Sequence, residues 1–214
     1  MDKQPSILLI GKHDDLYCEK AVEFVKLHFP RHTVILGKRG DVLAPQAAAW
    51  EGDYIVSYLS PWVIPEALLK KAGKAAINFH PGPPEYPGIG CTNFAVYDQS
   101  KMFGVTCHHM NTKVDTGKII AVRRFPLYAT DTVFSLTQRC YAHILTLFYD
   151  IMSIVLDGHQ LPAAQERWIR RPFLRKELNA LCELTPDMPA QEVARRVKAV
   201  TYPGAPGAYM RKTA

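Results

Sequence analysis

The stretch that decides the fold reads Ala75-Ala76-Ile77-Asn78-Phe79-His80-Pro81-Gly82-Pro83-Pro84-Glu85-Tyr86-Pro87-Gly88. It begins as a short apolar run typical of a buried strand, in which Asn78 and His80 stand two residues apart and therefore face the same side. The eight residues that follow contain four prolines and two glycines, which cannot extend the strand. Because ligands of open α/β sheets bind at the carboxyl ends of strands, the sequence predicts a cleft beside Asn78 and His80.

The segments on either side of this stretch alternate between strand and helix patterns. Apolar runs predict strands at 6–11, 33–36, 53–59, 104–110 and 118–125, and helical periodicity predicts helices at 14–28, 66–71, 92–102, 133–156 and 189–200. We therefore predict an α/β fold with a Rossmann-like, open, twisted, mostly parallel sheet and helices on both faces. The turn after the first strand lacks GxGxxG, so a dinucleotide cofactor is not expected.

Length and composition predict one domain. The chain has 214 residues, of which 48% are hydrophobic, so we expect a single domain over 1–214 with 160–214 as a C-terminal extension of the core. No run of about 18 apolar residues occurs and the first residues are polar, which predicts neither a membrane span nor a secretory signal, and hence a cytoplasmic protein. The five cysteines are odd in number and form no CxxC, which argues against a disulfide framework and a structural zinc.

The formal net charge of +6 comes largely from cations late in the chain. They lie at 167, 170, 171, 175 and 176 and again at 195, 196, 198, 211 and 212. One interpretation is a solvated helix face. The other is an anionic substrate, for which a phosphate or diphosphate fits better than nucleic acid because aromatic residues are not interleaved with these charges.

Two further segments have a structural and a functional interpretation. The apolar loop at 60–65 is either a buried corner or a slot for a flat ring whose edge bonds to backbone groups. The turn at 111–117 is rich in Asx, Thr and Gly, so Asp115 there is either a turn-former or a site residue.

Four short motifs resemble, in order and spacing, the formyltransferases that use N10-formyltetrahydrofolate. They are Asn-Phe-His-Pro at 78–81, Tyr-Pro-Gly at 86–88, Val-Thr-Cys-His-His-Met at 105–110 and Val-Asp-Thr-Gly-Lys-Ile-Ile at 114–120. The resemblance covers about residues 53 to 124, and 200–209 looks like the segment that ends the catalytic core in members with tRNA or sugar-nucleotide acceptors. After His80 the family's usual Ser-Leu-Leu-Pro is replaced by Gly-Pro-Pro-Glu at 82–85, which puts side-chain contacts from that loop in question.

The resemblance implies a catalytic trio of Asn78, His80 and Asp115. When an amine attacks the formyl carbon, the carbonyl oxygen becomes anionic, and an amide and an imidazolium suit that charge. Asp115 would hold His80 charged and oriented during proton transfer. No metal is implied, and we expect core or site-lining roles for His108 and His109. The implied folate pocket contains Trp62, Val63, Ile64, Thr112, Val114 and Asp115.

The acceptor implied by the resemblance is a nucleotide-linked amino-deoxy sugar of the kind used in surface polysaccharides such as lipopolysaccharide O-antigen. Residues 168–178 resemble a segment of the sugar N-formyltransferases, with which the resemblance is greatest. We expect the extension to contribute to acceptor binding, and Tyr86, Arg171, Arg175, Lys176 and Tyr202 to contact the acceptor. The expected partners are small molecules, folate and nucleotide sugar, without nucleic acid or membrane, and a homodimer is left open.

Other acceptors and roles remain as alternatives. The turn at 11–14 does not reproduce the phosphate loop of glycinamide ribonucleotide formyltransferases. The chain shows neither the β-rich second domain of the tRNA-specific relatives nor the regulatory domain of formyltetrahydrofolate hydrolases, which favours the sugar acceptor. A folate-binding module without turnover is the non-catalytic alternative.

Overall fold

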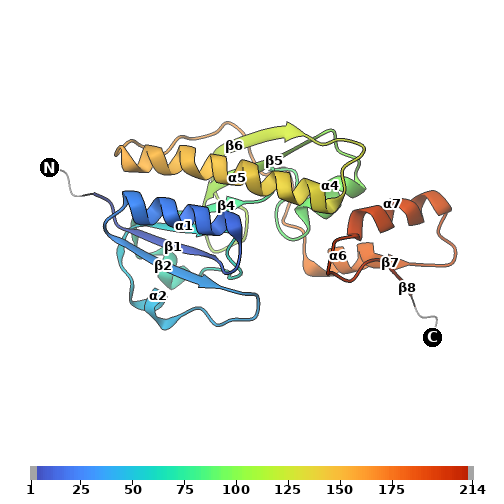
Figure 1. Cartoon of the computed structure of the whole chain (residues 1–214), viewed down its shortest axis with the longest axis horizontal. Coiled ribbons are helices and arrows are strands. Elements are labelled where there is room, and N and C mark those ends of the chain that lie inside the picture. The colour runs from blue at the N-terminus through green and yellow to red at the C-terminus, as the bar shows by residue number, and fades with distance from the viewer. Residues whose placement is uncertain (1–3, 212–214) are drawn as a thin grey trace.

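The computed structural model describes residues 4–211, and its centre is a six-stranded sheet (Figure 1). The strands lie in the order β2-β1-β3-β4-β5-β6. Their bounds are β1 Ile7–Lys12, β2 His32–Gly37, β3 Gly52–Tyr58, β4 Ala72–His80, β5 Met102–His109 and β6 Ile119–Pro126. The first four pair in parallel, whereas β5 pairs antiparallel with both β4 and β6. The predicted α/β class and mostly parallel sheet are confirmed.

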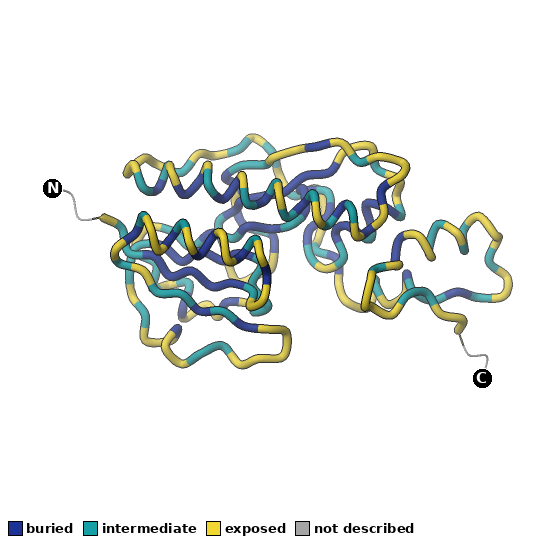
Figure 2. The backbone as a smooth tube through the Cα atoms, viewed as in Figure 1, coloured by how far each residue is buried: buried dark blue, intermediate teal, exposed yellow. Residues whose placement is uncertain are grey.

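Helices cover both faces of the sheet, as predicted. Helices α1 (Leu16–His28) and α5 (Val133–Leu156) lie on one face, and the short α2 (Pro45–Ala49) and α3 (Glu66–Leu69) on the other. Alternate residues of β1 enter the two layers, Ile7 and Leu9 one and Leu8 and Ile10 the other. The central strands are therefore buried on both sides, which explains their continuous apolar sequences (Figure 2).

Helix α5 is the most apolar long helix of the described chain. Within residues 4–211 it alone is long and apolar enough, by length and composition, to cross a membrane. Its buried residues pack against α1 and the sheet, so its apolar sequence is that of a core helix. A capping box between Thr132 and Ser135 fixes where it begins.

The expected helix over 92–102 is wrong at its end. Helix α4 spans Cys91–Tyr97, and β5 begins at Met102. Between them Gln99 has a left-handed backbone with φ 55°, which reverses the chain. Met102, the last residue of the expected helix, is the first residue of β5, where its neighbour Phe103 is fully buried. The helix expected over 66–71 also ends early, at Leu69, because β4 begins at Ala72.

The C-terminal elements lie at one end of the molecule (Figure 1). They are α6 (Arg175–Cys182), β7 (Glu183–Leu184), α7 (Ala190–Val200) and β8 (Tyr209–Met210), with β7 and β8 forming a separate parallel pair. The Phe173 ring stacks on the Phe94 ring with centroids 3.8 Å apart. The Phe173 backbone N–H donates to the Pro87 carbonyl (2.8 Å). This segment therefore docks on the proline-rich loop that follows β4.

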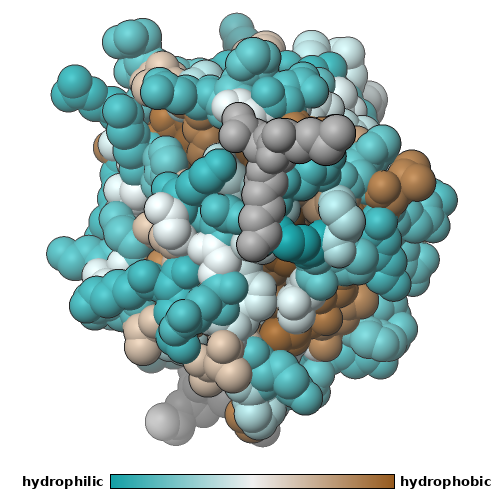
Figure 3. All heavy atoms as spheres, turned by 90° about the vertical axis from the view of Figure 1, so that its left-hand side faces the viewer, coloured by the Kyte–Doolittle hydropathy of each residue, from teal (hydrophilic) through white to brown (hydrophobic). Residues whose placement is uncertain are grey.

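The opposite end of the molecule, where the parallel strands begin, faces the viewer in Figure 3. Hydrophilic side chains dominate this face, and its apolar residues form separate patches. The candidate site lies at the other end of these strands, as expected for an open α/β sheet.

Gly88 allows the docking of the C-terminal segment. It has φ +86°, and a Cβ there would lie 2.4 Å from the Phe173 carbonyl oxygen. We predict that Gly88→Ala lowers the free energy of unfolding by about 2–3 kcal/mol, measured by urea denaturation. The control is Gly207→Ala, which meets nothing within 4 Å and should cost less than about 0.5 kcal/mol. Equal losses for both variants would contradict this account.

Candidate active site

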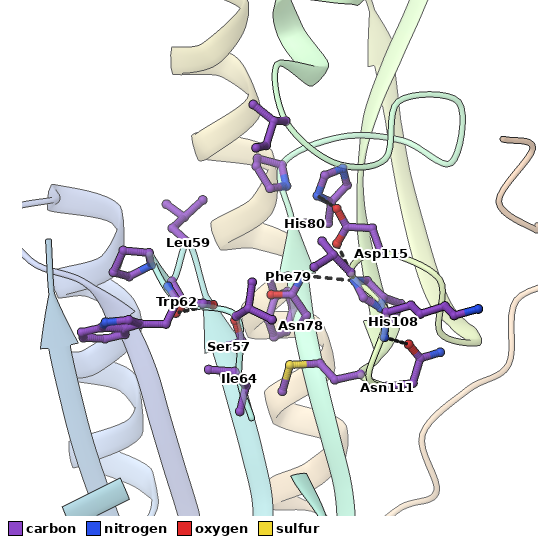
Figure 4. A pocket seen from close by; sticks show the side chains of 18 of the residues that line it. Ser57, Leu59, Trp62, Ile64, Asn78, Phe79, His80, His108, Asn111 and Asp115 are labelled. Carbon is purple, nitrogen blue, oxygen red and sulfur yellow. Dashed lines mark hydrogen bonds and ion pairs between the residues drawn. The ribbon is translucent and has the colours of Figure 1, made fainter. Parts of the chain in front are cut away.

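Four polar side chains meet near the carboxyl end of β4 (Figure 4). Asn78 and His80 belong to β4, His108 to β5 and Asp115 to the β5–β6 connection. The antiparallel register places Asn78 opposite His108. Asp115 has a left-handed backbone with φ 46°, which Asp tolerates better than most residues.

The Asp115 carboxylate lies between two imidazole rings. Its Oδ2 is 3.2 Å from His80 Nδ1 and its Oδ1 is 3.3 Å from His108 Nε2. The Gly88 backbone N–H also donates to Oδ2 at 2.8 Å. All three side chains are buried, with exposed fractions of 6% or less. The carboxylate thus joins two strands to the proline-rich loop.

These contacts determine the charge of Asp115. Burial by itself would raise its pKa, but the two histidines and the Gly88 N–H outweigh burial and lower the pKa to about 2. The carboxylate is therefore ionised at neutral pH. A buried anion is stable only when it is paired and hydrogen-bonded, which is the case here.

Both imidazole rings have an acceptor at each nitrogen. The Nε2 atom of His80 lies 3.0 Å from the Tyr86 carbonyl oxygen, and Nδ1 of His108 lies 2.8 Å from the His109 carbonyl oxygen. Since carbonyl and carboxylate oxygens only accept, each of these contacts is a hydrogen bond where the ring nitrogen carries a proton. Asn78 completes the cluster, because its amide nitrogen Nδ2 lies 3.1 Å from His108 Nε2.

Trp168 covers both rings from the C-terminal segment. Its indole packs edge-on against His80 and His108, with ring centroids 5.8 Å and 5.1 Å apart. Its Nε1 donates to the Gly117 carbonyl at 2.7 Å, which ties the segment to the loop that carries Asp115. The cluster is consequently shielded from water on this side.

A cavity of about 410 Å³ opens beside the cluster. Its walls are mostly apolar, and His80, His108, Asn111 and Asp115 lie together on one side of it, as in Figure 4. Of the expected folate contacts, Trp62, Val63, Ile64, Val114 and Asp115 line this cavity together with Asn78 and His80. Thr112 does not line it, because the turn directs its neighbours Asn111 and Lys113 there instead. The slot interpretation of residues 60–65 therefore fits the geometry.

The residues expected to contact the acceptor are not all at the cavity. Tyr86 is buried, and its hydroxyl donates to Asp98 (3.1 Å) and contacts Ser100 (2.5 Å). Its side chain is thus satisfied inside the protein, which corrects the expectation of a substrate contact. Burial also raises the pKa of Tyr86 to about 12.

The other expected acceptor contacts belong to the C-terminal part. Arg171 is exposed and paired with Glu177 (2.7 Å), and Lys176 is exposed on α6. Arg175 and Tyr202 line a second cavity, of about 580 Å³, between the core and the C-terminal elements. The structure therefore brings the trio together but separates it from these side chains.

Sequence reasoning missed two members of the site. His108 was expected only as a core or site-lining residue, although it bonds Asp115 and Asn78 directly. Trp168 was expected only as part of the segment at 168–178 and not beside the histidines. The signal for His108 was its position in the strand next to β4, but the pairing register that sets it opposite Asn78 cannot be read from spacing. Within residues 4–211 no group of three or more His, Cys, Asp or Glu could hold a metal ion, and the expected absence of a metal stays a prediction.

The depressed pKa of Asp115 gives a pH-dependent stability. In the unfolded chain the pKa of an Asp is about 3.9. The ionised Asp115 therefore stabilises the folded protein by about 2–3 kcal/mol above that pH, and this contribution is lost as the pH falls toward about 2. Asp115→Asn keeps the shape and tolerates the left-handed backbone. We predict that urea denaturation shows a large gap between wild type and this variant at pH 7 that shrinks from about pH 4 to pH 2.5. A gap independent of pH would refute the proposed charge state.

Comparison with known proteins identifies the family. The family model described as "Formyl transferase" matches residues 37–147. Methionyl-tRNA formyltransferase of Geobacillus thermodenitrificans is 28% identical over 135 residues, or 62% of this chain and 42% of the relative. GDP-perosamine N-formyltransferase of Brucella melitensis is 27% identical over 165 residues, or 77% of this chain and 62% of the relative. The chain thus spans about half the length of the curated relatives it matches.

Solved structures share the fold. A sugar N-formyltransferase from Shewanella sp FDAARGOS_354 superposes with a TM-score of 0.77 at 19% identity, covering 97% of this chain and 93% of the other. An N-formyltransferase from Helicobacter canadensis, solved with folinic acid and dTDP-3-aminofucose, gives 0.71 at 18% identity, covering 91% and 80%. Since the family model spans more than half of its residues, the chain belongs to the formyl transferase family.

Proposed function

We propose that this protein transfers the formyl group of N10-formyltetrahydrofolate to the amine of a nucleotide-linked amino-deoxy sugar. The observation that carries the proposal is the buried Asp115 carboxylate between His80 and His108, with Asn78 at the wall of an apolar cavity. Hydrogen-bond donors fixed in a site sheltered from water suit a reaction that develops negative charge on oxygen.

The proposed reaction has one addition and one elimination. The neutral sugar amine attacks the formyl carbon, a C–N bond forms and the carbonyl oxygen becomes an oxyanion. When this intermediate collapses, the bond from the formyl carbon to folate N10 breaks, and a proton from the attacking amine ends on N10. His80 and Asn78 would donate to the oxyanion, and Asp115 would keep His80 oriented and charged.

His80 reaches the formyl oxygen through Nε2 in this proposal. That nitrogen lies 3.0 Å from the Tyr86 carbonyl oxygen, so an incoming oxyanion would share or replace this hydrogen bond. Asp115 holds the other nitrogen, which limits the ring to small movements. The developing negative charge would then favour the new bond over that to a neutral carbonyl.

His108 acts as a positioning residue for Asn78. Its Nδ1 donates to the His109 carbonyl, and an N–H on Nε2 satisfies Asp115. The Asn78 Nδ2 lies 3.1 Å from that nitrogen, so with Nε2 protonated the carboxamide would turn about its terminal bond and present its oxygen to His108. This orientation turns the Asn78 NH2 group toward the cavity, where it would donate to the formyl oxygen.

The apolar cavity beside the cluster suits the pterin ring of the folate. Trp62, Val63 and Ile64 form an apolar wall, and Asn111 and Lys113 supply polar groups on the opposite loop. Support also comes from the Helicobacter canadensis protein of the same fold, which was solved with folinic acid.

The share of the chain that each relative matches supports a sugar acceptor. The GDP-perosamine N-formyltransferase match covers 77% of the chain, whereas the methionyl-tRNA formyltransferase match covers 62%. The Helicobacter canadensis structure contains dTDP-3-aminofucose. We further propose that the enzyme is cytoplasmic and that its formylated sugar is used in surface polysaccharide. Residues 160–214 would contribute to acceptor binding. Methionyl-tRNA remains the second candidate acceptor because of the methionyl-tRNA formyltransferase match.

The first functional prediction is that the protein formylates at least one UDP-, GDP- or dTDP-linked 3-amino or 4-amino sugar. Mass spectrometry with N10-formyltetrahydrofolate as donor measures the gain of one formyl group. Asn78→Ala should lower kcat by about 10²–10³-fold through loss of one oxyanion donor. Formylation of charged initiator tRNA alone would replace the sugar acceptor, and release of formate without acceptor would indicate a hydrolase.

A second prediction tests the positioning role of His108. We expect His108→Leu to lower kcat by about 10–100-fold with little change in the folate KM, because the Asn78 amide loses its fixed orientation. His108→Gln keeps a donor and should recover part of the rate. Equal rates for both variants, or a loss explained by lower stability in urea, would leave His108 with a packing role only.

A further inference from the structure

A third cavity, of about 620 Å³, adjoins the candidate active site. It lies between the β1–α1 connection, the β2–α2 connection and the beginning of α6. Its apolar lining residues Leu59, Pro61 and Ile89 also line the active-site cavity. The two cavities therefore share a wall, and one ligand could extend along both.

Cations dominate the polar lining of this third cavity. Lys12, Lys38, Arg39 and Arg175 line it, against the single carboxylate of Asp14. Two of these cations are paired, Lys12 with Asp15 at 2.9 Å and Lys38 with Asp14 at 2.6 Å.

Arg39 and Arg175 are different. Both side chains are exposed, and within residues 4–211 neither guanidinium forms an ion pair or a side-chain hydrogen bond. They come from segments far apart in the sequence, and burial together with the nearby charge of Arg39 lowers the pKa of Arg175. Each arginine therefore adds to the repulsion felt by the other.

The position of Arg175 is unfavourable for a second reason. It is the first residue of α6, where the helix dipole disfavours positive charge. Protein contacts in the described chain offset neither this cost nor the repulsion from Arg39. An anion placed between the two guanidinium groups would offset both, since each can donate two parallel hydrogen bonds to phosphate oxygens.

We propose that Arg39 and Arg175 bind the diphosphate of the nucleotide-activated acceptor, with Lys12 and Lys38 adding positive charge. This inference rests on the proposed function. The two unpaired guanidinium charges match the two negative charges of a sugar-linked diphosphate. A sugar attached to this diphosphate would lie along the shared wall of Leu59, Pro61 and Ile89, which directs its amine toward Asn78 and His80.

The same arrangement gives the nucleoside a place. Arg175 also lines the cavity that contains Tyr202 and Asn179, on the side of α6 that faces the core. A diphosphate on Arg175 would point its nucleoside into that cavity. The donor, the sugar, the diphosphate and the nucleoside would then occupy three adjoining cavities in that order.

Calorimetric titration with dTDP, UDP, GDP and inorganic pyrophosphate tests the inference. We expect wild type to bind at least one of these probes and Arg39→Gln/Arg175→Gln to weaken that binding at least about 30-fold. The control Lys20→Gln/Lys26→Gln removes the same charge from the exposed face of α1 and should bind as wild type does. Binding of 5-formyltetrahydrofolate should be equal in all three proteins.

A stability readout is independent of any ligand. Because the two arginines repel each other, the ligand-free Arg39→Gln/Arg175→Gln variant should melt no lower than wild type. A variant that melts several degrees lower would show that the arginines stabilise the fold, and would overturn the inference.

The outcomes separate this inference from the proposed function. Sugar formylation with an unchanged acceptor KM in the double variant would overturn the diphosphate site alone. Arginine-dependent binding of dTDP, UDP or GDP, with every amino sugar inert, would support the site and contradict the proposed acceptor. Arginine-dependent binding of charged initiator tRNA, without binding of any diphosphate probe, would overturn the inference in favour of an RNA.

Discussion

The rest of the site depends on one buried charge, the carboxylate of Asp115. It accepts from the Gly88 N–H and faces His80 on β4 and His108 on β5. An isolated carboxylate at this depth would be costly, so each partner is needed to keep it ionised. The same contacts fix the distance between β4, the proline-rich loop and the β5–β6 connection. The contacts that pair this charge therefore also align the reactive groups.

The sequence predicted the architecture through local signals, whereas the trio was implied by the family resemblance and its catalytic role stays a prediction. A continuous apolar strand that ends in Asn78 and His80 before a proline-rich loop indicates a buried strand and its edge. What it could not supply was non-local geometry. The register between β4 and β5 places His108 against Asn78, and Trp168 reaches the histidines from a distant segment. The helix expected over 92–102 failed for a related reason, because the left-handed Gln99 carries no strong sequence signal.

Three apolar residues line both the active-site cavity and the cation-lined cavity beside it. The active-site cavity is mostly apolar and close to the histidines, and the neighbouring cavity is lined by cations. Leu59, Pro61 and Ile89 belong to both. The β3–α3 loop supplies Leu59 and Pro61, so this loop borders both cavities. The cations late in the sequence therefore differ in their surroundings. Arg171 is paired with Glu177, whereas Arg175 lines the cation-lined cavity.

The connection between Trp168 and Gly117 has a consequence for the order of synthesis. A ribosome releases β4, β5 and the loop with Asp115 well before residues 168–173, which bond to Gly117, Pro87 and Ile89. Domains acquire their contacts as the chain emerges, and late segments must find partners that were made earlier. The nascent protein would thus carry its two histidines and its carboxylate uncovered until residues 168–173 emerge and dock. The cluster would therefore become sheltered from water only after these residues have been synthesised.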